Sequence, residues 1–288
     1  MDKQAVIDNA ARFIWQNARL LERRLFAQLF QNASRDPVAA AITAYRNADG
    51  GFGHALEPDV RAPSSQPLFC EIALRALHTA GIRDATLANG AAEFLASVAE
   101  PSGRVAIVTS DVLNYPRAVH WTSPEFSGDS PNPTAALAGM LRYQRVAQQW
   151  LDRASAWCWR RLEQPIDEAH EIVCVLTFLE HEADRKRASA VAVELAKAAD
   201  RAKWFLKEPG SAQYGLTPLH FCPRPDSIAS PAFDEALINA HLDDLARRQG
   251  PDGGWPISWT APSPAAEMEW RGIWTLDALV RLRACGRI

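Results

Sequence analysis

Apolar side chains recur at helical spacing along nearly the whole chain, and the strict alternation of a half-buried strand is almost absent. The first stretch, residues 6–30, shows this clearly. Its apolar positions return every three to four residues and include Phe13, Ile14, Leu20, Leu21, Leu25 and Leu29. Charged and amide side chains lie between them, which gives a helix one apolar face and one polar face. The pattern predicts an all-α fold.

Proline, glycine and acidic residues mark where the predicted helices begin and end. Pro67 suits the first turn of a helix that stops at Gly81, because proline lacks the N–H that this position leaves unused. Asp84 is an N-cap for residues 85–98, and Asn132-Pro133 opens the next helix in the same way. The remaining helices are expected at 37–44, 151–162, 168–181, 184–206, 231–249 and 265–284. The total is about ten helices.

Three long connections rich in proline, glycine and serine separate groups of these helices. They lie at 47–66, 100–131 and 208–231, and short connections such as 81–84 alternate with them. Irregular loops of this length in a compact domain usually carry function. We expect the long loops to gather on one rim of the fold.

A short motif of glycine followed by an aromatic residue recurs along the chain. Its sharp copies are Asn47-Ala48-Asp49-Gly50-Gly51-Phe52 and Gln249-Gly250-Pro251-Asp252-Gly253-Gly254-Trp255, and weaker copies lie at 101–104 and 211–216. Glycine permits the left-handed backbone of a chain reversal, and the aspartate binds nearby amides. About five to six helical hairpins with this period suit a closed ring. We therefore predict a single α/α toroid domain over residues 1–288.

Residues 249–255 resemble the Q-x-x-D-G-x-W repeat of squalene and hopene cyclases, and similar Gly-Gly-aromatic turns occur in protein prenyltransferase β subunits. In those families the motif ties neighbouring helices together. The resemblance gives this structural role to Asp49, Gly50, Gly51, Phe52, Gln249, Asp252, Gly253, Gly254 and Trp255. It implies a small terpene cyclase-like or prenyltransferase-like enzyme that acts on an isoprenoid or similar apolar substrate in a central aromatic-lined cavity.

The standard catalytic motifs of these families do not occur in the chain. It has no D-x-D-D acid, Asp243-Asp244 lacks the third acid of a D-D-x-x-D magnesium site, and no Asp-x-Cys zinc pair occurs. The phrase Pro251-Asp252-Gly253-Gly254-Trp255-Pro256 also resembles turns in some helical-toroid polysaccharide lyases. Two alternatives therefore stand beside the isoprenoid enzyme. One is a carbohydrate-active lyase or hydrolase, and the other is a non-catalytic ring that binds a ligand or a protein.

Composition narrows the partners of the chain. A formal net charge of −3 gives no basic excess that would bind nucleic acid. No apolar run approaches the roughly 20 residues of a membrane span, and the first residues lack a signal-peptide pattern, so we expect a cytoplasmic protein. The cysteines are odd in number, 5, and scattered without a C-x-x-C pair, which is typical of reduced core residues.

The first long loop carries the candidate catalytic residues. Glu57 or Asp59 would be a general acid or base, His54 would orient it, and Arg61 would orient it or bind an anion. A divalent metal held by His54, Glu57 and Asp59 is an alternative, although no motif assigns a metal or another cofactor. The other interpretation is a polar loop whose acids cap the next helix.

Candidate substrate-binding residues are spread over the other long loops and the last helix. The second long loop contributes Tyr115, His120 and Trp121, and the third contributes His220 near Cys222. The C-terminal part contributes Trp255, Trp259, Glu269, Trp270 and Arg271. Aromatic rings there would stabilise a carbocation or stack on a sugar, and the arginine would bind an anion. The alternative is that these rings only pack the loops and the last helix.

Overall fold

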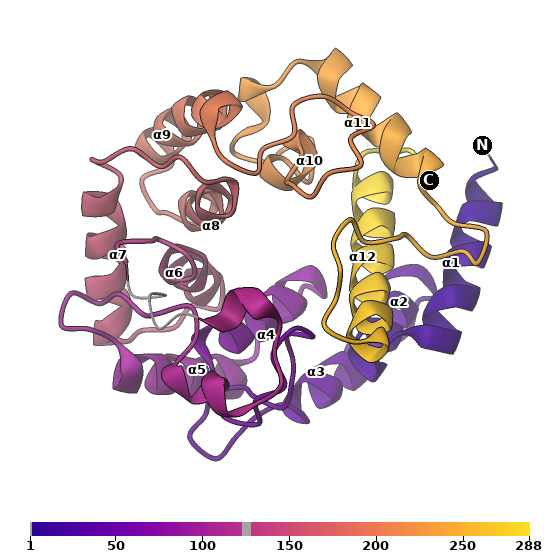
Figure 1. Cartoon of the computed structure of the whole chain (residues 1–288). Coiled ribbons are helices and arrows are strands. Elements are labelled where there is room, and N and C mark those ends of the chain that lie inside the picture. Colours follow the sequence, from indigo (N-terminus) through magenta and orange to yellow (C-terminus); the bar gives the residue numbers. More distant parts are fainter. Residues whose placement is uncertain (1, 123–127) are drawn as a thin grey trace. The chain divides into compact units, whose positions relative to one another are not determined.

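The structure, a computed structural model, describes residues 2–122 and 128–288, and these residues are helical and irregular without a strand (Figure 1). Only isolated bridges join single residues of different segments. The helices are α1 (Lys3–Asn17), α2 (Leu20–Phe30), α3 (Asp36–Thr43), α4 (Pro67–Thr79), α5 (Ala85–Val98), α6 (Thr134–Tyr143), α7 (Gln149–Arg161), α8 (Ala169–Glu180), α9 (Arg185–Ala198), α10 (Pro218–Phe221), α11 (Glu235–Arg247) and α12 (Pro264–Ala284). The predicted all-α class is confirmed.

The chain divides into two compact units. Unit 1 comprises Met1–Ala33, Asp167–Ala169 and Ser189–Ile288, and unit 2 comprises Ser34–Ile166 and His170–Ala188. In unit 1, α12 packs against α1, α2 and α11. In unit 2, α4 packs against α3, α5 and α6, and α7 packs against α5 and α6. The single domain over residues 1–288 stays a prediction beside this division.

Local sequence signals predict the positions of most helices correctly. Asp84 caps α5 as predicted, because its carboxylate accepts hydrogen bonds from the amides of Thr86 and Leu87, both at 3.0 Å. Pro67 is the first residue of α4. The predicted helix over 6–30 is instead two helices, because Ala18 adopts an extended conformation with φ −77° and ψ 160°. The short α10 lies in a segment that was predicted as loop.

Three tight turns share one hydrogen-bond pattern. Within 47–51, 100–104 and 250–254, the first amide bonds to the fifth carbonyl at 2.8–2.9 Å, and the fourth amide bonds to the first carbonyl at 2.9–3.1 Å. The fifth amide bonds to the side chain of the third residue, which is Asp49, Ser102 or Asp252. The fourth residue is a glycine with φ between 87° and 96° in each turn. The segment 211–216 has different hydrogen bonds.

Each of these glycines lies against the backbone of a neighbouring helix. A Cβ atom on Gly50 would lie 2.6 Å from the carbonyl oxygen of Gly90 in α5. A Cβ on Gly103 would lie 2.5 Å from the amide of Ala154 in α7, and one on Gly253 would lie 2.1 Å from the carbonyl oxygen of Asn9 in α1. The turns therefore tie helices together within each unit.

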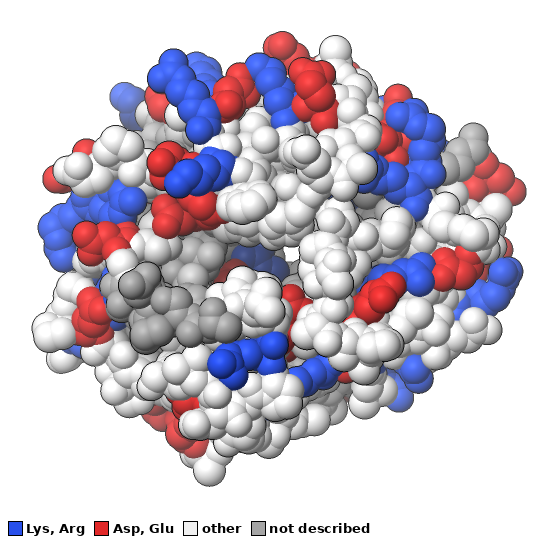
Figure 2. Space-filling view, viewed as in Figure 1, with Lys and Arg blue, Asp and Glu red and all other residues white. Residues whose placement is uncertain are grey.

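The face of the molecule in Figure 2 carries lysine and arginine side chains interspersed with acidic ones, without a broad tract of one sign. Within the described residues, no helix has the length and apolar character that crossing a membrane requires.

Candidate functional site

The first long loop of unit 2 folds back on itself directly after the turn at 47–51. The amides of His54 and Ala55 bond to the carbonyls of Pro63 and Ala62 at 3.3 and 3.2 Å. Both of these residues have φ 58°, a left-handed conformation that side chains seldom adopt. This reversal encloses an apolar centre of three fully buried side chains, Leu56, Val60 and Ala62.

Two carboxylic acids are buried in this loop. Glu57 is 4% exposed and Asp59 is 3% exposed, on either side of Pro58. Both interact with neighbouring groups of the structure. The two candidate acids therefore lie in a loop that shields their side chains from bulk water.

The second long loop is attached to the first beside these acids. The carbonyl of Asp59 accepts the amide of Ala118 at 2.8 Å, and the amide of Arg61 bonds to the carbonyl of Pro116 at 2.9 Å. Arg117 then donates to three carbonyls of its own loop, those of Leu113, Tyr115 and Trp121. Backbone hydrogen bonds thus join the loop that carries Tyr115 and Trp121 to the loop that carries Asp59 and Arg61.

His120 lies close enough to Asp59 for their charges to interact. Loss of surrounding water lowers the pKa of His120 from its ordinary value, and the negative charge of Asp59 opposes that shift. The ring of His120 contacts Trp121 at 5.0 Å between centroids. His120 and His54 are both exposed, and the Nε2 of His54 is 2.9 Å from the Oδ1 of Asn47.

Unit 1 contains a pocket with a cavity volume of about 90 Å³ that opens to solvent. Its walls come from residues 206–220, from the facing sides of α11 and α12, and from 255–258. The predicted substrate-binding residues His220 and Trp255 line it. Neither Glu57 nor Asp59 belongs to this pocket.

Other predicted residues of unit 1 lie next to the pocket. Trp274 lines it, and Trp259 contacts both Trp274 and Trp270, with ring centroids 5.8 and 5.2 Å apart. Glu269 is half-buried on the same helix and interacts with neighbouring groups. The structure therefore brings the predicted tryptophans of the C-terminal part together.

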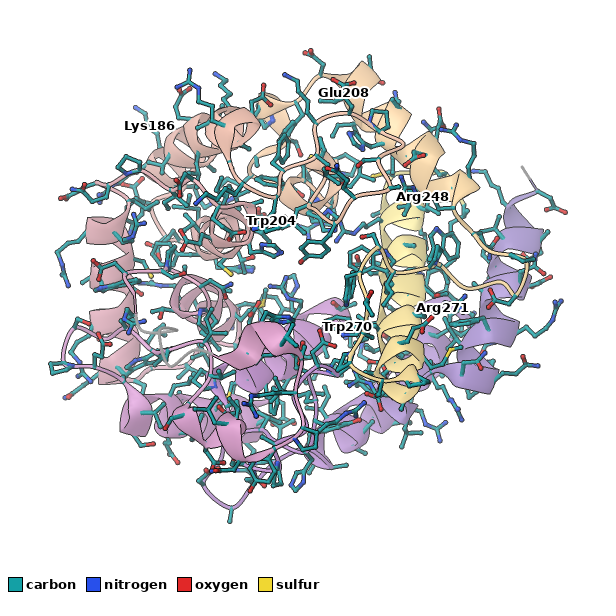
Figure 3. The ribbon with its side chains drawn as sticks, in the orientation of Figure 1. Lys186, Trp204, Glu208, Arg248, Trp270 and Arg271 are labelled. Atoms are coloured by element: carbon teal, nitrogen blue, oxygen red, sulfur yellow. The ribbon has the colours of Figure 1, made fainter. Side chains whose placement is uncertain are left out.

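Arg271 lies on the opposite side of α12 from Trp270 (Figure 3). Its guanidinium pairs with both carboxylate oxygens of Asp252, at 2.9 and 2.7 Å, and lies over the ring of Phe13 at 4.6 Å. Its positive charge is thus engaged by the turn at 250–254. These contacts join α12 to the turn at 250–254, and substrate binding by Arg271 stays a prediction.

Two acid–arginine pairs in the pocket wall were not among the predicted site residues. Asp244 on α11 pairs with Arg248, the residue directly after that helix, and Asp277 pairs with Arg281 on α12, each at 2.7 Å. Both pairs have the spacing of four residues that places side chains on one helix face. That spacing is readable from the sequence, but only the structure shows that the two faces line one pocket.

Among residues 2–122 and 128–288, no group of three or more histidine, cysteine, aspartate or glutamate side chains is arranged to hold a metal ion.

Comparisons with known proteins identify the class of fold. No protein-family model and no curated protein matches the sequence. A protein from Actinoplanes of known structure matches 98% of this chain with 99% of its own, at 16% identity and a TM-score of 0.57. A type II terpene cyclase from Scytonema, solved in complex with its substrate geranylgeranyl dihydroxybenzoate, matches 99% of this chain with 98% of its own, at 11% identity and a TM-score of 0.55.

At these identities the likeness shows the fold alone. The chain has a terpene cyclase-like, all-α fold over its whole length, which agrees with the fold class that the glycine-aromatic turns predicted.

Proposed function

We propose that the chain is a small enzyme that acts on an isoprenoid or similarly apolar substrate by carboxylate acid–base chemistry. The observation that carries this proposal is the burial of Glu57 and Asp59, with the imidazole of His120 close enough to Asp59 for their charges to interact. The shared fold supports the substrate class, since the neighbour from Scytonema is a terpene cyclase whose substrate bears a geranylgeranyl chain.

The proposed reaction begins with proton transfer from a carboxylic acid to an alkene. The O–H bond of Asp59 or Glu57 breaks as a C–H bond forms, which leaves a carboxylate and a carbocation. The face of an aromatic ring such as that of Trp121 stabilises such a cation. A base, either the carboxylate or the imidazole of His120, then removes a proton from a carbon next to the cation, and a new alkene forms. Arg61 and Tyr115 are proposed to contact the substrate.

Isosteric variants test this assignment. Purified protein is incubated with geranylgeranyl-bearing substrates and with uncharged geranylgeraniol, and isomerised or cyclised products are sought by gas chromatography with mass spectrometry. Asp59→Asn or Glu57→Gln is expected to lower turnover by about 10²-fold or more, the typical contribution of a general acid. Asp152→Asn, which changes an exposed acid on α7 of the same unit, is the matched control.

The melting temperature of each variant distinguishes a lost proton donor from a lost fold. Unchanged turnover in both Asp59→Asn and Glu57→Gln would rule out the carboxylates as the acid. Absence of any product from the unmodified protein, with all the substrates offered, would count against the isoprenoid reaction itself.

A further inference from the structure

Four of the charged side chains in the wall of the unit 1 pocket form two ion pairs. Asp244 with Arg248 and Asp277 with Arg281 form closed pairs, each at 2.7 Å. The two arginines also donate to backbone carbonyls, Arg248 to Ser211 and Arg281 to Leu219. Their positive charge is therefore already engaged by protein oxygens. An anionic ligand such as a diphosphate would have to compete with these contacts.

The same pairs disfavour a purely hydrocarbon ligand. Covering an ion pair with apolar groups removes its remaining water, and that desolvation costs more than the pair regains. The polar wall is extended by Ser258, Gln213 and Thr217, and by Glu208 at the exposed rim (Figure 3). A neutral ligand with many hydroxyl groups both donates to the carboxylates and accepts from the guanidinium groups.

Aromatic rings supply the apolar part of the wall. Trp274 is half-buried, and its ring lies 5.6 Å from that of His220 and 5.8 Å from that of Trp259. Trp255 is buried, and its ring N–H donates to the carbonyl of Leu245 at 2.7 Å. The C–H face of a sugar ring is apolar and packs on a partly exposed indole such as that of Trp274, while its hydroxyls point outward to polar side chains.

The aromatic contacts continue from the pocket to the surface of unit 1. Trp259 contacts Tyr214 at 5.5 Å, and Tyr214 contacts Trp204 at 5.9 Å. Trp204 is 55% exposed, although exposing an indole is unfavourable. Its backbone is also left-handed, with φ 63°, and its carbonyl accepts the amide of Leu216 at 2.7 Å. A bulky residue held in this conformation with its ring in solvent suggests a functional constraint.

We propose that the unit 1 pocket binds a neutral oligosaccharide, with one sugar ring over Trp274 between the acid–arginine pairs and the following rings along the aromatic run that ends at Trp204. This site does not depend on the proposed acid chemistry of Glu57 and Asp59.

Chain-length dependence measured by titration calorimetry tests the proposal. The probes are cellobiose, cellotetraose, maltose and maltotetraose, with geranylgeranyl diphosphate as the anionic, apolar comparison. The tetrasaccharide of the preferred linkage is expected to bind about ten-fold more tightly than its disaccharide, the equivalent of about 1.4 kcal/mol. Geranylgeranyl diphosphate is expected not to displace it.

Variants locate the site. Trp204→Ala is expected to remove most of the ten-fold gain of the tetrasaccharide and to leave the disaccharide affinity unchanged. Trp15→Ala is the matched control, since Trp15 is 40% exposed on α1 of the same unit. Asp277→Asn is expected to weaken both sugars, and it removes a charge without removing a ring from the aromatic cluster.

Three results would contradict the proposal. If none of the four sugars binds to the folded protein at millimolar concentration, the proposal is wrong. It is also wrong if Trp204→Ala and Trp15→Ala change the tetrasaccharide affinity equally, or if geranylgeranyl diphosphate displaces the sugar. Sugar binding is measured on the unmodified protein and does not depend on the turnover of Asp59→Asn. A failure of the sugar proposal is therefore distinguishable from a failure of the proposed reaction.

Discussion

The turn at 47–51 in unit 2 and the turn at 250–254 in unit 1 have the same hydrogen bonds but lead into different surroundings. After the first, the chain enters a loop that buries Glu57 and Asp59. After the second, it enters a loop whose Trp259 lies beside a pocket with charged and aromatic side chains in its wall. The comparison teaches that the repeated turn builds the fold, whereas the side chains that follow it differ and hold the candidate chemistry.

The aspartates of the two turns also differ in what holds them. Asp49 accepts the hydroxyl of Ser65 at 2.7 Å, whereas Asp252 binds the guanidinium of Arg271. In unit 1 the amide of the following aromatic residue, Trp255, bonds to the Thr275 hydroxyl, and in unit 2 Cys70 makes the corresponding bond with the backbone of Phe52. The same turn is thus compatible with different partners for its aspartate and for the backbone of the aromatic residue that follows.

The largest expected effect comes from filling the space beside a turn glycine. In Gly253→Ala the new Cβ would lie 2.1 Å from the carbonyl oxygen of Asn9, and the backbone has φ 90°. We expect a loss of about 3–4 kcal/mol in unfolding free energy, measured by urea denaturation. Gly286→Ala is the control, with φ 71° and open space, and should lose only about 1 kcal/mol. Equal losses would show that close packing of the turn contributes nothing.

A smaller effect is expected from the threonines that bind the backbone after each turn. Thr275→Val leaves the buried amide of Trp255 without its acceptor, and Thr134→Val removes bonds to both the amide and the carbonyl of Val105. We expect losses of about 1–3 kcal/mol in unfolding free energy, larger at Thr134. Thr177→Val, which removes a bond within one helix, is the control. The comparison of turns fails if this control loses as much as the other two variants.

At the first turn Cys70 makes the bond that the threonines make at the other two turns. The reactivity of its thiol is a further way to compare the turns. Burial raises the pKa of the Cys70 thiol to about 12, although the bond with the backbone of Phe52 acts in the opposite direction. It should therefore resist Ellman's reagent at pH 8 in the folded protein. Cys285, which is only partly buried, should react first. Rapid reaction of Cys70, located by mass spectrometry, would contradict a closed turn.

The smallest expected effect is the pH dependence of the Asp252 contact. Partial burial alone would raise the pKa of Asp252, but hydrogen bonds from Arg271 and the amide of Gly254 lower it below its ordinary value of 3.8. Because the folded pKa is the lower one, the contact stabilises the protein above pH 3.8, and that stability is lost as the pH falls through the lowered pKa. The unmodified protein and Asp252→Asn should therefore differ less in unfolding free energy at pH 3 than at pH 6. A constant difference in urea midpoint would refute this.

The sequence predicts those elements whose signals are local. α5 has the predicted bounds, because Asp84 caps it and Pro101 and Gly103 follow its end. The break between α1 and α2 has no such signal, since Ala18 is a good helix former that is extended here by its surroundings.

The candidate sites also differ in how far local sequence patterns indicate them. The sequence indicates the acid loop as a candidate because its polar residues lie within nine positions of one another, from Gly53 to Arg61. It indicates only some residues of the unit 1 pocket, because the wall combines side chains from 206–220, α11 and α12 that no local pattern links. The ion pair of Arg271 could not be predicted, since its partner Asp252 lies 19 residues away in a turn.

The most direct test of the account is thermal unfolding of the unmodified protein with geranylgeraniol, with cellotetraose or maltotetraose, and with both ligand classes together. A ligand at about 100 times its dissociation constant adds roughly 2.7 kcal/mol of stability, which is readily visible as a rise in melting temperature. We predict that each class raises the melting temperature and that the two rises add, because no residue of the acid loop lines the pocket. Rises that fail to add would place both ligands in one site, and no rise with either class would contradict the account altogether.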